Sequence, residues 1–119
     1  MEDRSQVEAV ISKFFEALNI DDASDVPLAK DVKYYGMLTS APTCGEVDVR
    51  DHIQQIAPFM EDEKYDKIII DNGSVAVRGE FDSVNGQHYE GAFFFEVQDS
   101  ELTEVRVIFD TRRMFEGKK

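Results

Sequence analysis

The chain has 119 residues, of which 25 are acidic and 13 basic, giving a formal net charge of −12. A length of this order is enough for one hydrophobic core, so we expect a single domain spanning residues 1–119. The excess negative charge repels nucleic acids and anionic membranes, so we expect neither as a partner.

The sequence shows neither an export signal nor a disulfide framework. Residues 1–4 are mostly charged, and no stretch reaches the roughly 18 apolar residues that cross a membrane. The single Cys44 has no partner for an intrachain disulfide and cannot build a thiolate metal site. We therefore expect a cytoplasmic protein.

The first half of the chain predicts two amphipathic helices with a short strand between them. Apolar residues spaced three and four apart predict a helix at about residues 5–19, and Ser5 with Glu8 has the capping-box pattern. Residues 26–29 predict a short helix and residues 32–35 a strand.

The second long helix is predicted from about Asp48 to Met60. Its apolar residues again follow helical spacing, and Asp48 is a suitable N-cap. Pro58 lacks a backbone donor and is expected to kink or end this helix. Residues 61–63 are all acidic and predict a solvated link.

The rest of the chain predicts an antiparallel meander. Asn72-Gly73 and Asn85-Gly86 are strong signals for two-residue hairpin turns. Helices followed by a meander predict an α+β fold, in which the helices pack on one face of a bent sheet. The four strands are expected at residues 65–70, 75–82, 87–97 and 102–110.

Phe93-Phe94-Phe95 predicts a sheet whose two faces are both covered. Side chains alternate along a strand, so this run places bulky apolar groups on both sides. We expect Phe93 and Phe95 to face the helices and Phe94 to face outward. An outer patch of Val77, Phe81, Phe94 and Ile108 then predicts a homodimer.

Arg78 and Glu80 are the leading candidates for a functional centre. They are two residues apart and so share one face of their strand, which we expect to be the inner, aromatic face. Charges inside a cavity are costly unless they pair or bind something polar. If the pair instead faces solvent, it forms surface salt bridges of little consequence.

Two tyrosines and two histidines are the remaining polar candidates for a functional site. Tyr34 and Tyr35 each offer a hydroxyl that can orient a ligand, or that is simply satisfied in a core, and Tyr35 is our third catalytic candidate. His52 and His88 are expected to have no functional role. Neither has a second ligand at metal-site spacing, so we expect no metal and no cofactor.

Four stretches, taken with the order of elements, carry a resemblance that covers nearly the whole chain. The stretches are Phe14-Phe15-Glu16-Ala17-Leu18-Asn19, Ala29-Lys30-Asp31-Val32, Gly45, and residues 102–112 with Phe109-Asp110. They resemble the nuclear transport factor 2-like (NTF2-like) superfamily, which includes ketosteroid isomerase, SnoaL-like polyketide cyclases and limonene-epoxide hydrolase. The resemblance implies a cone, in which a curved, mixed, mainly antiparallel sheet wraps around N-terminal helices and encloses an apolar cavity. It also implies a homodimer formed through the outer sheet face.

The resemblance transfers catalytic groups only in part. Limonene-epoxide hydrolase uses an Arg and an Asp two apart, which Arg78 and Glu80 match, and a second Asp that falls on Val107. Its water-holding Tyr falls on Tyr34 or Tyr35, and its Asn on the residue two positions further along. The helix Tyr and general-base Asp of ketosteroid isomerase fall on Phe14 and Gly36.

We therefore expect a small-molecule pocket protein that binds a small hydrophobic ligand, with transformation of that ligand by acid–base chemistry left open. A non-catalytic ligand-binding or dimeric interaction module is an equal alternative, and a cavity filled by its own side chains is a third. The catalytic candidates are Arg78, Glu80 and Tyr35. The expected ligand-binding walls are Phe14, Phe15, Leu18, Ile56, Phe59, Tyr89, Phe93, Phe95, Val107 and Phe109.

Overall fold

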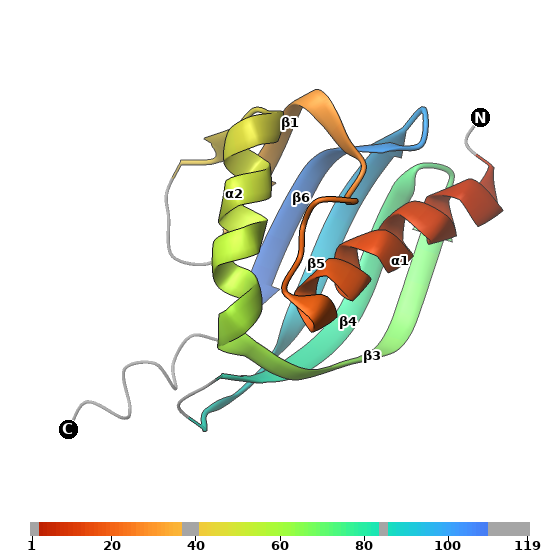
Figure 1. Cartoon of the computed structure of the whole chain (residues 1–119). Helices are drawn as coiled ribbons and strands as arrows, with labels where there is room; N and C mark the ends of the chain where they lie inside the picture. The colour runs from red at the N-terminus through yellow and green to blue at the C-terminus, as the bar shows by residue number, and fades with distance from the viewer. Residues whose placement is uncertain (1–2, 37–40, 84–85, 110–119) are drawn as a thin grey trace.

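The computed structural model describes residues 3–36, 41–83 and 86–109, and in these ranges it contains two α-helices and six strands (Figure 1). The strands form one sheet in the order β2-β1-β6-β5-β4-β3, in which β1 and β6 are parallel and the other neighbours antiparallel. The elements are α1 (Arg4–Ile20), β1 (Leu28–Tyr35), β2 (Thr43–Cys44), α2 (Glu46–Ile56), a 3₁₀ turn η1 (Ala57–Phe59), β3 (Met60–Asp71), β4 (Ser74–Ser83), β5 (His88–Gln98) and β6 (Glu101–Phe109).

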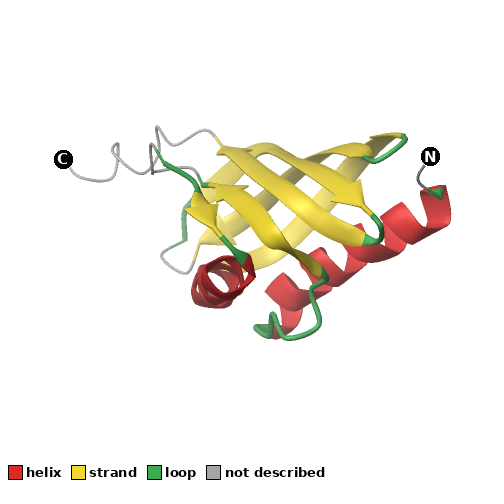
Figure 2. Ribbon diagram, turned by 90° about the horizontal axis from the view of Figure 1, so that it is seen from above, coloured by secondary structure: helices red, strands yellow, loops and turns green. Residues whose placement is uncertain are grey.

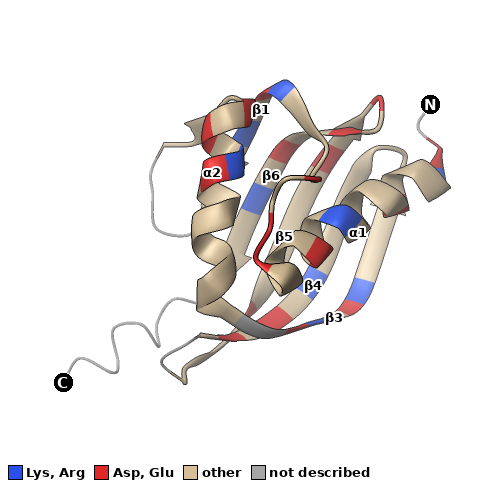
Figure 3. Cartoon of the chain, in the orientation of Figure 1, with Lys and Arg blue, Asp and Glu red and all other residues tan. Residues whose placement is uncertain are grey.

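Both helices lie on the same face of the sheet, and the sheet curves over them (Figure 2). This is the predicted α+β arrangement of a mixed, mainly antiparallel sheet wrapped around helices. Acidic residues lie on both helices and along the sheet (Figure 3). Neither described helix combines the length and the apolar character needed to cross a membrane.

Helix α1 begins at a different cap from the one predicted. The side chain of Asp3 accepts a hydrogen bond from the backbone N–H of Ser5 at 2.8 Å, so Asp3 is the N-cap and the Ser5–Glu8 capping box is wrong. The helix ends at Asp21, which adopts the left-handed conformation and donates its N–H to the carbonyl of Ala17. One face of the helix packs against the sheet, as its spacing predicts.

Three of the predicted boundaries are wrong. Residues 26–29 do not form a helix, because β1 already begins at Leu28 and pairs there with β6. Helix α2 begins at Glu46, after Gly45, instead of at Asp48. The acidic stretch 61–63 is part of β3 rather than a link. The expected effect of Pro58 is confirmed, since the α-helix ends at Ile56 and passes into η1.

Two glycines face each other in the sheet, where Gly79 on β4 is opposite Gly91 on β5. A Cβ at Gly91 would lie 2.7 Å from the Cα of Phe109 on β6, a separation that real structures do not show. A Cβ at Gly79 would lie 3.4 Å from the ring of Tyr65. The absence of side chains at both positions therefore lets the strands bend closely over the core.

Of the two predicted hairpin turns, Asn72-Gly73 is confirmed. It links β3 to β4, and Asn72 has the positive φ of 57° that such turns require. Asn85 of the second predicted turn lies outside the described residues. The β5–β6 hairpin turns at Asp99 and Ser100, which both have positive φ.

Candidate functional site

The inner face of the sheet carries a continuous set of aromatic rings. Phe14 on α1 lies 6.0 Å from Phe93 and 5.1 Å from Phe95, measured between ring centroids. Phe93 in turn lies 5.2 Å from Phe109, which lies 5.0 Å from Phe81. The expected inward orientation of Phe93 and Phe95 is correct, and their rings pack against α1.

The structure brings eight of the ten expected wall residues together in this core. The exceptions are Ile56, which is only partly buried, and Phe59, whose 61% exposure places it outside the core. Because the rings pack against one another, they occupy the space between α1 and the sheet. The buried eight are Phe14, Phe15, Leu18, Tyr89, Phe93, Phe95, Val107 and Phe109.

Arg78 and Glu80 lie on the outer face of the sheet, so the expectation that they face the interior is wrong. Arg78 is paired in register with Ala92 and Glu80 with Glu90, whereas Val77 is paired with Phe93 on the inner face. The alternating strand β4 turns its apolar side toward the core because burial of apolar surface drives folding.

The Arg78 side chain forms a salt bridge with Asp66 on the outer face. Its guanidinium donates to both carboxylate oxygens of Asp66, at 2.9 and 2.7 Å. The hydrogen bond from Arg78 lowers the pKa of Asp66, and both side chains are more than 60% exposed. Such a pair contributes little to stability in water. The solvent-facing alternative considered for Arg78 is the one observed.

The tyrosine that faces inward is Tyr34, whereas Tyr35 was the catalytic candidate. Tyr34 is buried, its ring lies 4.6 Å from that of His52, and burial raises the pKa of its hydroxyl. Burial also lowers the pKa of His52. The Arg106 guanidinium lies 3.9 Å from the ring centroid of Tyr35, which belongs to the outer side of the sheet.

A groove of about 520 Å³ runs between α1 and the edge strand β3. Its floor includes Phe15 and Tyr65, whose ring centroids are 3.8 Å apart. Polar and charged side chains line its rim. The lining residues are Arg4, Glu8, Ile11, Ser12, Phe15, Glu16, Asn19, Tyr65, Ile68 and Ile70.

Tyr65 is the polar group in this groove that sequence reasoning missed. Its hydroxyl oxygen is buried and has no hydrogen-bond partner among the described residues. Burial first, and then the negative charge of Glu63, raise the pKa of Tyr65, so the hydroxyl keeps its proton at neutral pH. A neutral, buried hydroxyl without a partner is a hydrogen-bond donor available to a ligand.

A bulge in β3 explains why simple alternation does not reveal Tyr65. Tyr65 pairs with Gly79 but Lys67 pairs with Arg78, so Asp66 is an extra residue in the strand. Ile68 and Ile70 consequently share the inner side with Tyr65 although their numbers differ in parity from it. A second hollow of about 430 Å³ lies past the end of α1, and Asn19 and Glu63 line it.

The comparisons with known proteins define the fold. No protein-family model and no curated protein matches the sequence. Among solved structures, an NTF2-like protein of unknown function from Mesorhizobium loti has a TM-score of 0.81 at 16% identity, covering 92% of this chain and 96% of that one.

Two similar structures are of proteins described as enzymes. A steroid delta-isomerase from Pseudomonas aeruginosa has a TM-score of 0.79 at 15% identity, covering 97% of this chain and 96% of that one. An LEH-like epoxide hydrolase from M. tuberculosis has a TM-score of 0.76 at 20% identity, covering 95% and 89%. The chain therefore has the NTF2-like fold. At these sequence identities the structural similarity establishes the fold alone. Any chemistry has to be argued from the residues of the site.

Proposed function

We propose that this chain binds a small, neutral, mostly apolar molecule in the groove between α1 and β3. The observation that carries the proposal is the buried Tyr65 hydroxyl without a partner, next to a groove of about 520 Å³. A buried donor without a partner costs about 1–3 kcal/mol, which an acceptor atom on a ligand offsets. The apolar floor favours a hydrocarbon body, as in other small-molecule sites.

The charges around the groove argue against an anionic ligand. Glu8 and Glu16 line it, and Arg4, its basic residue, is already paired with Glu8 at 2.9 Å. An anionic ligand would be repelled by this rim. Ketones, epoxides and esters have the required acceptor oxygen without a charge.

The proposal is a binding function, and it does not rest on Arg78 and Glu80. Their outward orientation removes the support for the acid–base centre expected from the sequence. The non-catalytic binding module is therefore the alternative that the geometry favours. The NTF2-like isomerase and epoxide hydrolase structures support a small-molecule role only as proteins of the same fold.

The test is a thermal-shift screen with neutral ketones, epoxides and esters, followed by calorimetric titration of the best ligand. Tyr65→Phe keeps the ring and removes the hydroxyl. We expect it to weaken binding about tenfold, the effect of losing one hydrogen bond of ~1.4 kcal/mol. The stability of the free protein should stay equal or rise, because the substitution removes a donor that has no partner.

Two further variants make the screen decisive. Ser12→Trp places a bulky ring in the groove and should abolish binding, whereas Tyr35→Phe, on the outer side of the sheet, should leave it unchanged. Equal affinity in wild type, Tyr65→Phe and Ser12→Trp, or no ligand from the screen, would refute the groove as the binding site.

We also propose that two copies pair through the outer face of the sheet. Phe94 and Ile108 are 40% and 55% exposed on the adjacent central strands β5 and β6. Exposed apolar groups on the middle of a sheet favour association with a second apolar surface. Val77 and Phe81, which were expected in this patch, are buried on the inner face and do not belong to it.

A further inference from the structure

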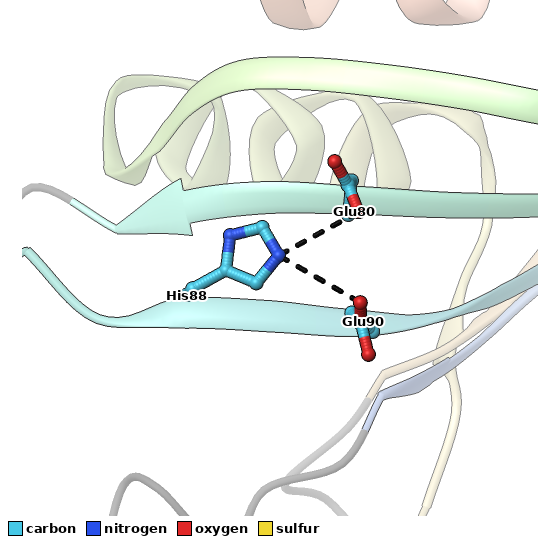
Figure 4. Close-up of side chains that lie close together, drawn as sticks. All are labelled: Glu80, His88 and Glu90. Atoms are coloured by element: carbon cyan, nitrogen blue, oxygen red, sulfur yellow. Dashed lines mark ion pairs between the residues drawn. The ribbon is translucent and has the colours of Figure 1, made fainter.

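Four side chains converge on the outer face of the sheet, near the start of β5. His88 Nδ1 lies 2.7 Å from a carboxylate oxygen of Asp82. His88 Nε2 lies 3.6 Å from Glu80 and 3.9 Å from Glu90, and Figure 4 shows this ring nitrogen directed at both carboxylates. The cluster is open to water, since the His88 side chain is 39% exposed.

The cluster has the donor set and the support of a metal site. One imidazole nitrogen and two carboxylate oxygens, all within 4.8 Å of one another, are contributed by His88, Glu80 and Glu90. Asp82 accepts from Nδ1 when that nitrogen carries the ring proton, which leaves the Nε2 lone pair directed at the two carboxylates. A carboxylate behind the ligating histidine is the usual outer partner in zinc sites.

The strand register provides an independent reason to expect a cation. Glu80 and Glu90 are directly opposite each other on β4 and β5, and like charges at such positions repel. The net charge of −12 adds to this unfavourable field. Two basic residues lie nearby: Arg78, which is held by Asp66 at 2.7 Å and whose charge also acts on Glu90, and Lys64, which is in register with Glu80. Neither forms an ion pair with Glu80 or Glu90 among the described residues.

We propose that Glu80, His88 and Glu90 bind a divalent zinc ion, with Asp82 positioning the His88 ring and a water molecule in the fourth position. Zinc accepts mixed nitrogen and oxygen donors in tetrahedral sites. Bonds of about 2.1 Å place tetrahedral ligand atoms about 3.4 Å apart. The separations of 3.6 and 3.9 Å require only small rotations of exposed side chains.

The competing possibility is a purely ionic cluster. The hydrogen bond to Asp82 raises the pKa of His88, which favours a protonated ring paired with the surrounding carboxylates. A proton and a zinc ion compete for the same Nε2 lone pair, so the two states are mutually exclusive. Zinc binding at neutral pH therefore distinguishes them.

The experiment titrates ZnCl₂ into the metal-stripped chain, using calorimetry and the histidine ring signals in nitrogen-15 NMR spectra. We expect one equivalent to bind and to shift the His88 ring signals while those of His52 stay in place. His88→Ala and the double variant Glu80→Gln/Glu90→Gln should each weaken binding at least tenfold. Asp82→Asn should weaken it about 10–100-fold, as loss of such an outer partner does in other metal sites.

The matched control is His52→Ala, since His52 is the only other histidine of the chain. It should bind zinc as tightly as wild type. MgCl₂ should compete poorly, because Mg²⁺ prefers oxygen ligands alone. The proposal is overturned if zinc leaves the His88 signals unchanged, or if His88→Ala and His52→Ala bind zinc equally well. These results are independent of the groove, so failure here does not affect the proposed ligand-binding function.

Discussion

At the scale of single residues, the packing of β6 against β5 depends on Gly91. The strand backbone of β6 leaves no room for a Cβ at this position, since the Cα of Phe109 is 2.7 Å from where that atom would lie. Backbone atoms cannot move aside as the end of a flexible side chain can. The close contact of β6 with β5 at this point therefore requires glycine.

Gly91→Ala should destabilise the protein by about 1–3 kcal/mol or more, the range for overpacking a well-packed site. Gly79→Ala is the matched variant, because its Cβ would lie 3.3 Å from the nearest atom and needs a smaller adjustment. Urea denaturation of both variants measures the difference. Equal free energies of unfolding for the two would contradict the steric argument.

Single-residue roles were predictable where alternation is regular and one face is clearly apolar. The orientation of Phe93, Phe94 and Phe95 follows from period-two alternation and is confirmed. The same alternation on β4 places Val77 inside and Arg78 outside, whereas the prediction grouped Val77 with Phe94 on the outer face. The apolar side of a strand is the more reliable guide to its inner face.

At the scale of elements, the loop between α1 and β1 is held by side chains of α2. Arg50 donates to the backbone carbonyls of Ala23, Ser24 and Val26 at 2.7, 3.1 and 2.9 Å. Gln54 accepts from the N–H of Ala23 at 2.9 Å and donates to the carbonyl of Asp21. This irregular loop thus obtains its hydrogen bonds from a neighbouring helix, where a strand would pair with another strand.

Arg50→Met should lower the free energy of unfolding by about 2 kcal/mol, because the loss of the charged donor leaves part-buried backbone carbonyls without hydrogen-bond partners. Arg50→Lys should recover only part of this loss, since an ammonium lacks the planar fork that reaches several carbonyls. Amide hydrogen exchange should become faster at residues 22–26 in both variants.

Arg4→Met is the control for this comparison. Arg4 has an exposed partner, Glu8, so we expect a change within about 0.5 kcal/mol. Two results would show that the hydrogen bonds from Arg50 do not hold the loop between α1 and β1. One is an Arg50→Met variant no less stable than Arg4→Met, and the other is unchanged amide hydrogen exchange in that loop.

Most of the long elements were predictable because their patterns are local, the exception being the acidic start of β3, whereas short elements depend on distant partners. Helix α1 and strands β4 to β6 lie within about two residues of their expected positions. Strand β2, two residues long, was not predicted, because only pairing of Thr43 and Cys44 with β1 defines it. The bulge at Asp66 was missed for the same reason, since the pairing with β4 creates it.

At the scale of the whole molecule, the open question is what covers the outer face of the sheet. We expect light scattering at low micromolar concentration to give twice the monomer mass of 13.6 kDa. The double variant Phe94→Glu/Ile108→Glu should be monomeric, because it places like charges at the centre of the proposed interface and removes its exposed apolar groups.

Phe59→Glu is the control, because Phe59 is more exposed than Phe94 and Ile108 but lies in η1 rather than on the sheet. It should leave the mass unchanged. A monomeric wild-type protein, or a double variant that still dimerises, would refute the interface.

The sequence by itself determined the class of fold. Its helical spacing, its hairpin turns and its two-sided phenylalanine run are local signals, and burial of apolar surface makes them consistent with one curved sheet over two helices. Only the tertiary structure decided the sites. Tyr65 reaches the groove through a bulge, and Glu80 meets His88 and Glu90 through strand register. Neither bulges nor register can be derived from spacing along a single strand, since both arise from pairing between strands.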